Sequence, residues 1–220
     1  MPVHNGERYL AEAIESVLGQ TRADLELIVV DDASTDGSRA VAERYDLRWL
    51  SQKRAGPGAA RNLGVEQARG RYLAFLDHDD YWVPEKLEWQ FERLADSPDV
   101  DLLFGHVQNF RSPELDPEAA ATIECPPDPL PGPLPATLLV PTQTFRSVGP
   151  FGTSARYVNE FLDWLVLADR RSLRRLMMPE VLLWRRLHET NLHRREPDGR
   201  QDYLHSLKAM LDQRRAAGAK

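Results

Sequence analysis

The sequence predicts an α/β fold in which a mainly parallel sheet is flanked by helices. Two observations predict it: short apolar runs alternate with helical patterns over residues 1–110, and two of these runs end in acidic clusters. Ligands of such sheets bind at the carboxyl ends of the strands. The acidic clusters, Asp31-Asp32 and Asp77 to Asp80, are therefore expected at one edge of the sheet.

The helices of this region are predicted from apolar spacing and from start and stop residues. The first is expected over residues 9–18, with Asn5 as its cap and Gly19 at its end. The strands are short and rich in branched apolar residues. Further helices are expected over 39–45, 57–68 and 84–94, and strands over 25–30, 47–50, 72–76 and 100–104.

Eight of the sixteen prolines lie between Arg111 and Pro135, so this stretch is predicted to be a loop or linker. It divides the chain into an α/β lobe (1–110), a proline-rich loop (111–135) and a second lobe (136–220). The second lobe is expected to contain a helix over 161–167, a strand over 181–184 and a closing amphipathic helix with Tyr203, Leu204, Leu207 and Leu211.

The composition excludes several classes of protein. A net charge of -6 argues against nucleic-acid binding, and the single Cys125 excludes an internal disulfide. No apolar run is long enough to span a membrane and no signal segment is visible, which predicts a cytoplasmic protein. Nine arginines between Arg170 and Arg200 leave two interpretations open. They form either a solvated helical face or a surface for phosphates, including those of a membrane at its inner face.

The acidic residues at the strand ends indicate a metal site. Crowded carboxylates repel one another unless a positive group joins them. Mg²⁺ and Mn²⁺ prefer oxygen ligands and keep positions for substrate phosphates, so one or two carboxylates and a diphosphate complete a shell. The alternative is that Asp77 to Asp80 form only a solvated turn.

Three segments of residues 1–94 follow one another with a recognisable spacing: PVHNGERYLAEAIESVLGQT, LELIVVDDASTDGS and GPGAARNLGVEQARGRYLAFLDHDDYWVPEKLE. In order and spacing they resemble family-2 glycosyltransferases. The resemblance implies the GT-A fold, a bacterial enzyme and transfer of a sugar with inversion. The implied partners are a nucleoside-diphosphate sugar, first of all a UDP-sugar, and a saccharide or lipid-linked acceptor of surface polysaccharide synthesis.

The resemblance also implies where the nucleotide binds. Asp32 would contact the base, with Pro2 and Asn5 nearby, and Arg61 would reach the base or the phosphates. Asp31 has the alternative of capping the turn that follows it. Arg61 has the alternative of lying on the surface of its helix.

In the same way Asp77-His78-Asp79 corresponds to the DxD motif of the family. Asp79 is the expected direct ligand of Mn²⁺ or Mg²⁺, while Asp77 is expected beside the donor sugar and the metal. His78 is a spacer, and Asp80 supports the motif without binding the ion. Trp82 is expected to pack, with stacking on a sugar ring as the alternative.

The second lobe resembles the family less closely. Glu160 occupies the position of the general base, and Asp163 is the rival candidate. Both have the alternative of being acids at the start of a helix. Further along, Arg185 or Arg186 is implied to hold the diphosphate, and His188 to complete the metal shell, within an RR-x-H-x-x-N pattern.

One departure from the family concerns the first strand, which normally precedes the PVxNG segment. That strand is expected to be missing here. Either the start of the chain is assigned too late, or the chain is truncated, or another segment fills the slot. Three rival functions remain: a GT-A domain that binds nucleotide without transfer, a response-regulator receiver domain and a nucleotidyltransferase.

Overall fold

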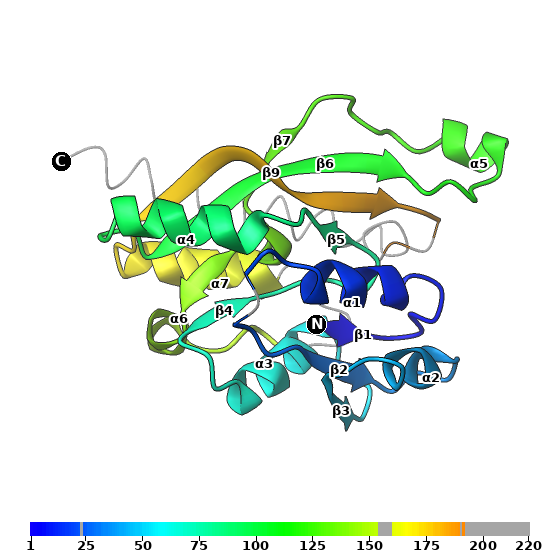
Figure 1. The fold of residues 1–220 in the computed structure, drawn as a ribbon, viewed down its shortest axis with the longest axis horizontal. Coiled ribbons are helices and arrows are strands. Elements are labelled where there is room, and N and C mark those ends of the chain that lie inside the picture. The colour runs from blue at the N-terminus through cyan, green and yellow to red at the C-terminus, as the bar shows by residue number, and fades with distance from the viewer. Residues whose placement is uncertain (23, 154–159, 190, 192–220) are drawn as a thin grey trace.

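The computed structural model describes residues 1–22, 24–153, 160–189 and 191, and within them the chain forms two sheets (Figure 1). The first sheet is parallel, as predicted, and has the order β1 (Pro2–Val3), β2 (Ile28–Asp32) and β3 (Arg48–Gln52). Its middle strand is almost fully buried because its apolar residues are covered on both faces. The sheet ends at Asp31 and Asp32, which places the first acidic cluster at its carboxyl edge.

The second sheet is mixed, with the order β4-β8-β6-β9-β5 and with β7 paired to β6. Only β6 and β9 are parallel, because strands from residues 130–187 insert between those of the first 111 residues. The prediction of a mainly parallel sheet therefore holds for the first sheet alone. The strands are β4 (Tyr72–Ala74), β5 (Tyr81–Trp82), β6 (Leu102–Arg111), β7 (Leu130–Gly132), β8 (Leu139–Pro141) and β9 (Arg175–Leu187).

The five helices predicted within the described residues are present as α1 (Leu10–Leu18), α2 (Ser38–Ala42), α3 (Pro57–Gln67), α4 (Lys86–Asp96) and α7 (Glu160–Arg170). The helix α6 (Thr142–Val148) was not predicted. Asn5, however, is not the cap of the first helix, whose N-cap is Tyr9. The side chain of Asn5 instead accepts a hydrogen bond from the amide of Thr35 at 2.8 Å, because the loops after β1 and β2 meet at this edge of the sheet.

The proline-rich stretch has more structure than predicted. It contains the short helix α5 (Pro117–Ala121), the strand β7 and the 3₁₀ turn η1 (Pro135–Thr137). Pro117 occupies the first turn of its helix, where a missing amide hydrogen costs nothing, and Asp116 caps that helix. Proline is thus compatible with both elements, because β7 pairs with β6 alone.

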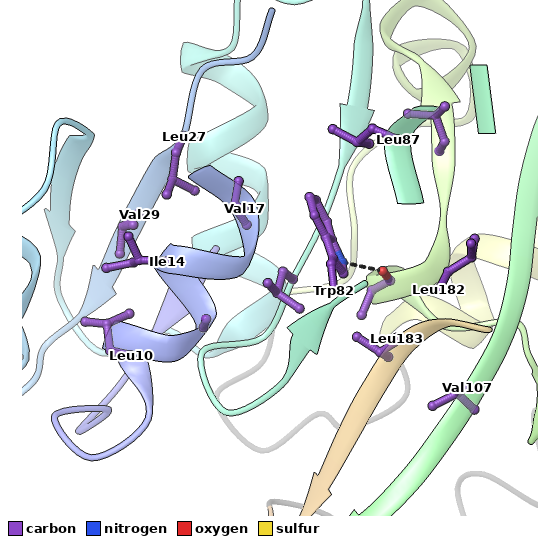
Figure 2. Packing of buried hydrophobic residues seen from close by; sticks show 14 of the residues in the cluster. Leu10, Ile14, Val17, Leu27, Val29, Trp82, Leu87, Val107, Leu182 and Leu183 are labelled. Carbon is purple, nitrogen blue, oxygen red and sulfur yellow. Dashed lines mark hydrogen bonds between the residues drawn. The ribbon is translucent and has the colours of Figure 1, made fainter. Parts of the chain in front are cut away.

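Helix α1 connects the two sheets (Figure 1). Its apolar stripe of Leu10, Ile14 and Val17 faces β2 on one side and the region of Trp82 on the other (Figure 2). Trp82 is buried and donates a hydrogen bond from Nε1 to the carbonyl of Ala136 at 2.8 Å. It is a packing residue, as expected, and the alternative of stacking on a sugar is wrong.

The slot expected to lack its strand holds the two-residue strand β1. The α-amino group of Met1 donates to the carbonyl of Ile28 at 2.8 Å, and burial lowers its pKa to about 5. Beyond Met1 the slot continues as a groove of about 650 Å³ between the start of β2 and β4. Its walls are mostly apolar and include Leu27, Ile28, Leu73, Phe75 and Leu139.

Two predictions concern the later part of the chain. The closing amphipathic helix with Tyr203, Leu204, Leu207 and Leu211 lies outside the described residues. None of the helices in the described part is long and apolar enough to cross a membrane.

Candidate active site

The Asp77 to Asp80 segment forms the loop between β4 and β5, and the end of β9 lies against it. The Oδ2 atom of Asp79 is 3.0 Å from Nε2 of His188 and accepts a hydrogen bond from Nδ2 of Asn191 at 3.3 Å. Burial opposes ionisation of Asp79, but the His188 hydrogen bond and the charges of His78 and His188 outweigh it. They hold the pKa of Asp79 at about 2. The structure thus brings together Asp79 and His188, both expected at the metal.

Asp80 has a different environment. It is buried, and Oδ1 accepts the backbone N–H of Arg186 at 2.8 Å. Burial, followed by the charges of Asp79 and Asp77, raises its pKa well above the usual range. Asp80 therefore ties the loop to β9, as its expected supporting position implied.

Arg186 is enclosed by the protein. Its guanidinium is sandwiched between the rings of Tyr9 and Phe110, with both centroids at 4.7 Å. It donates to the carbonyl of Asp79 at 3.0 Å and pairs with Glu12 of α1. Because successive side chains of β9 point to opposite faces, Arg186 points toward α1. Its contacts with Asp79 and Glu12 connect the loop between β4 and β5 to that helix. Arg185, on the other face of the strand, is only half-buried and stays the candidate for phosphate.

Arg61 joins the two halves of the site. It lies in α3, is only 7% exposed, and pairs with Asp77 and with Glu160, each at 2.6 Å. Burial lowers the pKa of its guanidinium, but the charges of Asp77 and Glu160 outweigh burial and leave the pKa raised. The alternative that Arg61 is a surface residue of its helix is therefore wrong.

Glu160 begins α7 and is buried against α3. Its Oε1 accepts from Arg61, whereas Oε2 has no hydrogen-bond partner among the described residues. Gly58 permits this approach: a Cβ there would lie 3.1 Å from Cγ of Glu160 and 2.3 Å from the carbonyl of Gly152. Asp163 lies in the first turn of the same helix and is half-buried.

Asp32 organises the loop that leads into α3. Its side chain accepts the amides of Ala55 at 2.7 Å and Gly56 at 2.9 Å, and the side chain of Gln52 at 2.8 Å. Asp31 caps the following turn through the amide of Ser34 at 2.8 Å, which confirms the capping alternative for this residue.

The remaining predicted nucleotide residues lie at the same sheet edge. Pro2 pairs with Val30 in the parallel sheet, and Asn5 bridges to the turn after β2 with a positive φ of 51°. Within the described part of the chain, neither residue forms a hydrogen bond to the Asp79 group. They border the Asp32 loop, where the resemblance implies the base.

Two residues of the site make contacts that the sequence did not predict. His78, expected to be a spacer and not a ligand, packs against Gly6 so closely that a Cβ on Gly6 would come within 2.5 Å of its ring. Asn191 binds Asp79 directly, and the only signal for it is its place in the RR-x-H-x-x-N pattern. Neither contact is visible locally, since the partners are more than 70 residues apart.

The donor set fits Mn²⁺ or Mg²⁺ with few protein ligands. Asp79 is ionised and half-buried, and His188 is next to it. Within the described residues no group of three or more His, Cys, Asp or Glu side chains is placed to hold an ion alone. That arrangement suits an ion whose shell is completed by the phosphates of a substrate.

Some of the arginines between Arg170 and Arg200 form ion pairs with aspartates. Arg174 pairs with Asp99, and Arg175 pairs with Asp169 at 2.6 Å. Arg170 and Arg171 are exposed. These contacts favour the solvated-face interpretation for the arginines next to α7, while the last three lie outside the described residues.

Comparison with known proteins shows which protein family the chain belongs to. Residues 1–131 match the model of glycosyl transferase family 2. An uncharacterised glycosyltransferase of Rickettsia prowazekii is 32% identical over 211 residues, which cover 86% of this chain and 63% of that relative. The putative teichuronic acid biosynthesis glycosyltransferase TuaG of Bacillus subtilis is 41% identical over 102 residues, or 43% of this chain and 40% of TuaG. This chain thus spans less than two thirds of either relative's length.

The fold has solved counterparts. TarS residues 1–349 of S. aureus, in complex with UDP-GlcNAc, superimposes with a TM-score of 0.67 at 20% identity, covering 86% of this chain and 58% of that one. Its complex with UDP gives a TM-score of 0.62 at 19% identity, with 86% and 59% covered. These matches confirm the predicted fold and remove the receiver-domain and nucleotidyltransferase alternatives. The chain belongs to glycosyl transferase family 2 and has the GT-A fold.

Proposed function

We propose that this chain transfers a sugar from a nucleoside-diphosphate sugar, a UDP-sugar in the first instance, to an acceptor hydroxyl with inversion. The observation that carries the proposal is the meeting of two groups at one sheet edge. One is the Asp79–His188 pair, and the other is the Asp77–Arg61–Glu160 chain of ion pairs. The first supplies metal and phosphate binding, and the second links the donor side to a buried carboxylate.

The donor is proposed to lie along the edge formed by Pro2, Asn5, Asp32 and Arg61. Asp32 orders the 55–56 loop near the proposed base pocket by accepting the amides of Ala55 and Gly56. The Nε atom of Arg61 is buried without a hydrogen-bond partner among the described residues. A buried donor of this kind is satisfied when a phosphate oxygen binds. Arg185 supplies a second positive charge on the β9 side.

A divalent cation, Mn²⁺ or Mg²⁺, would be held by Asp79 with help from Asp77 and His188. When bound, it would neutralise the charge that develops on the leaving nucleoside diphosphate. The ionised state of Asp79, with a pKa of about 2, keeps this carboxylate ready for the ion at neutral pH. Arg186 and Asp80 hold the loop in place from behind.

Glu160 is proposed as the general base. It would take the proton of the acceptor hydroxyl while the hydroxyl oxygen bonds to the anomeric carbon and the bond to the diphosphate breaks. Its buried Oε2, which no described residue bonds, fits a proton acceptor for this step. Asp163, one turn further along α7, is the rival candidate.

Binding without transfer remains the second candidate, and a specific observation favours it. Oε1 of Glu160 is engaged by Arg61 in this structure, so the carboxylate serves as a base only through its other oxygen. Turnover by the native protein separates the two candidate functions, because binding without transfer predicts UDP binding and no product.

Substitution tests which residue is the base. Glu160→Gln is expected to abolish transfer while leaving UDP binding within about threefold, and Asp163→Asn is expected to retain transfer. The opposite pattern would assign the base to Asp163.

The acceptor is proposed to be a saccharide or lipid-linked saccharide of bacterial surface polysaccharide synthesis. The named role of TuaG in teichuronic acid biosynthesis supports this class of product. Peripheral contact with a membrane would follow from a lipid-linked acceptor. Vesicle co-sedimentation with and without anionic lipid tests that contact.

A thermal-shift screen tests the donor and metal parts of the proposal. The protein is heated with UDP, UDP-sugars and other nucleoside diphosphates, first with Mn²⁺ and then with EDTA. A ligand at 100 times its Kd stabilises by about 2.7 kcal/mol, which is readily detected. Metal-dependent stabilisation is expected in the native protein and in the exposed-site control Asp46→Ala, but not in Asp79→Ala. Equal stabilisation of Asp79→Ala would remove Asp79 from the metal shell.

A further inference from the structure

Asn191 is a buried amide whose two polar atoms both serve the site. Its Oδ1 accepts the backbone N–H of His188 at 2.6 Å. Its Nδ2 donates to the carbonyl of Arg186 at 3.1 Å and to Oδ2 of Asp79 at 3.3 Å. One side chain therefore closes the turn after β9 and reaches the loop between β4 and β5, 112 residues away in sequence.

These contacts orient the Asp79 carboxylate. Both Asn191 and His188 approach the same oxygen, Oδ2, and no side chain in the described part of the chain bonds to Oδ1. Because a carboxylate group is planar, hydrogen bonds that hold Oδ2 in place also fix the position of Oδ1. An amide suits this task because it donates a hydrogen bond without a charge, so the negative charge of Asp79 stays available for a cation.

We propose that Asn191 is a positioning residue that sets Asp79 and His188 in one arrangement to receive the divalent cation. The inference rests on the proposed function, since it concerns the same metal. Asn191 itself is not a ligand here, because its carbonyl oxygen is taken by the His188 amide. Partners that orient metal ligands in this way typically contribute 10–100-fold to metal affinity, so an effect of about that size is expected.

The test measures Mn²⁺ affinity by electron paramagnetic resonance titration in the presence of UDP, with UDP affinity in EDTA as a second readout. Asn191→Ala is expected to weaken Mn²⁺ binding by about 10-fold or more and to leave metal-free UDP binding unchanged. Glu189→Gln, which changes an exposed side chain of the same turn, is the matched control and should bind Mn²⁺ as the native protein does.

Two further outcomes complete the test. If Asn191→Ala unfolds, Asn191→Ser retains an oxygen that accepts the His188 amide, and the same loss of Mn²⁺ affinity is expected of it. Mn²⁺ binding by either folded variant within twofold of the native value would overturn the positioning role alone. Absence of Mn²⁺ binding by the native protein would overturn both this role and the metal part of the proposed function.

Discussion

Ala33 has a backbone conformation that its side chain disfavours. It follows Asp32 with a φ of 62°, in the left-handed region that glycine adopts without a clash. Ala33 lies in the turn that is capped by the hydrogen bond from the Ser34 amide to the Asp31 side chain. The backbone therefore cannot relax at Ala33 without moving the acidic residues Asp31 and Asp32. Strain of this kind is common beside ligand sites.

We expect Ala33→Gly to raise the free energy of unfolding by roughly 1 kcal/mol, because the Cβ clash disappears. Urea denaturation measures the change. Ala11→Gly, in the regular helix α1, is the control and should lower the same quantity by about 0.5–1 kcal/mol. A loss of stability in both variants would show that the strain at Ala33 is small.

Lys86 is a buried charge that the proposed mechanism does not use. It is fully buried, donates to Oε1 of Gln90 at 2.7 Å, and lies 4.2 Å from the centroid of the Trp82 ring. Burial lowers its pKa from 10.5 to about 7. Between these values the unfolded chain binds a proton that the folded chain lacks, so stability rises with pH over that window.

The resulting prediction compares native protein with Lys86→Met by urea denaturation at pH 8.0 and 9.5. The native protein should gain stability with pH, by up to about 1.4 kcal/mol for each pH unit, relative to the variant. The α-amino group of Met1 has the same sign of effect, but its ordinary pKa of 8.0 in an unfolded chain places most of that effect below this window. Parallel pH dependences in the two proteins would contradict the assignment to Lys86.

At the scale of elements, helix α3 contains two glycines in opposite surroundings. A Cβ on Gly58 would collide with the Gly152 carbonyl at 2.3 Å and press on Glu160. A Cβ on Gly64 would meet only Cγ2 of Val30, at an ordinary 3.5 Å. The first glycine therefore sets the distance between α3 and α7, whereas the second leaves an ordinary helical position without a side chain.

Gly58→Ala is accordingly expected to cost about 1–3 kcal/mol of stability and to lower turnover more than donor affinity, since Glu160 must move. Gly64→Ala should stabilise by up to about 1 kcal/mol and leave turnover unchanged. Thermal denaturation and product assays on both variants check this contrast. Equal turnover in the two variants would show that Gly58 does not determine the position of Glu160.

At the scale of the whole molecule, an apolar groove lies between the start of β2 and β4. One edge of β4 has no strand partner among the described residues, because β4 pairs only with β8.

The sequence predicted those parts of the fold that depend on local pattern. The helices of residues 1–110, the acidic end of β2 and the acidic loop that follows β4 agree with the apolar periodicity and the turn residues. The insertion of β8 beside β4 and of β9 beside β6 could not be predicted, because pairing over such separations depends on packing that no short window contains. For the same reason the sequence suggests phosphate binding for Arg186, whereas its place on β9 turns it toward α1.

The Arg61 bridge has an evolutionary consequence. One guanidinium pairs with both Asp77 and Glu160, so loss of Arg61 would leave the buried Glu160 carboxylate without its partner, at a cost of about 3–5 kcal/mol for a buried pair. Changes at these three positions are therefore expected to compensate one another. Among descendants of a common ancestor, the three residues should be kept or replaced as a set, even though they come from three distant parts of the chain.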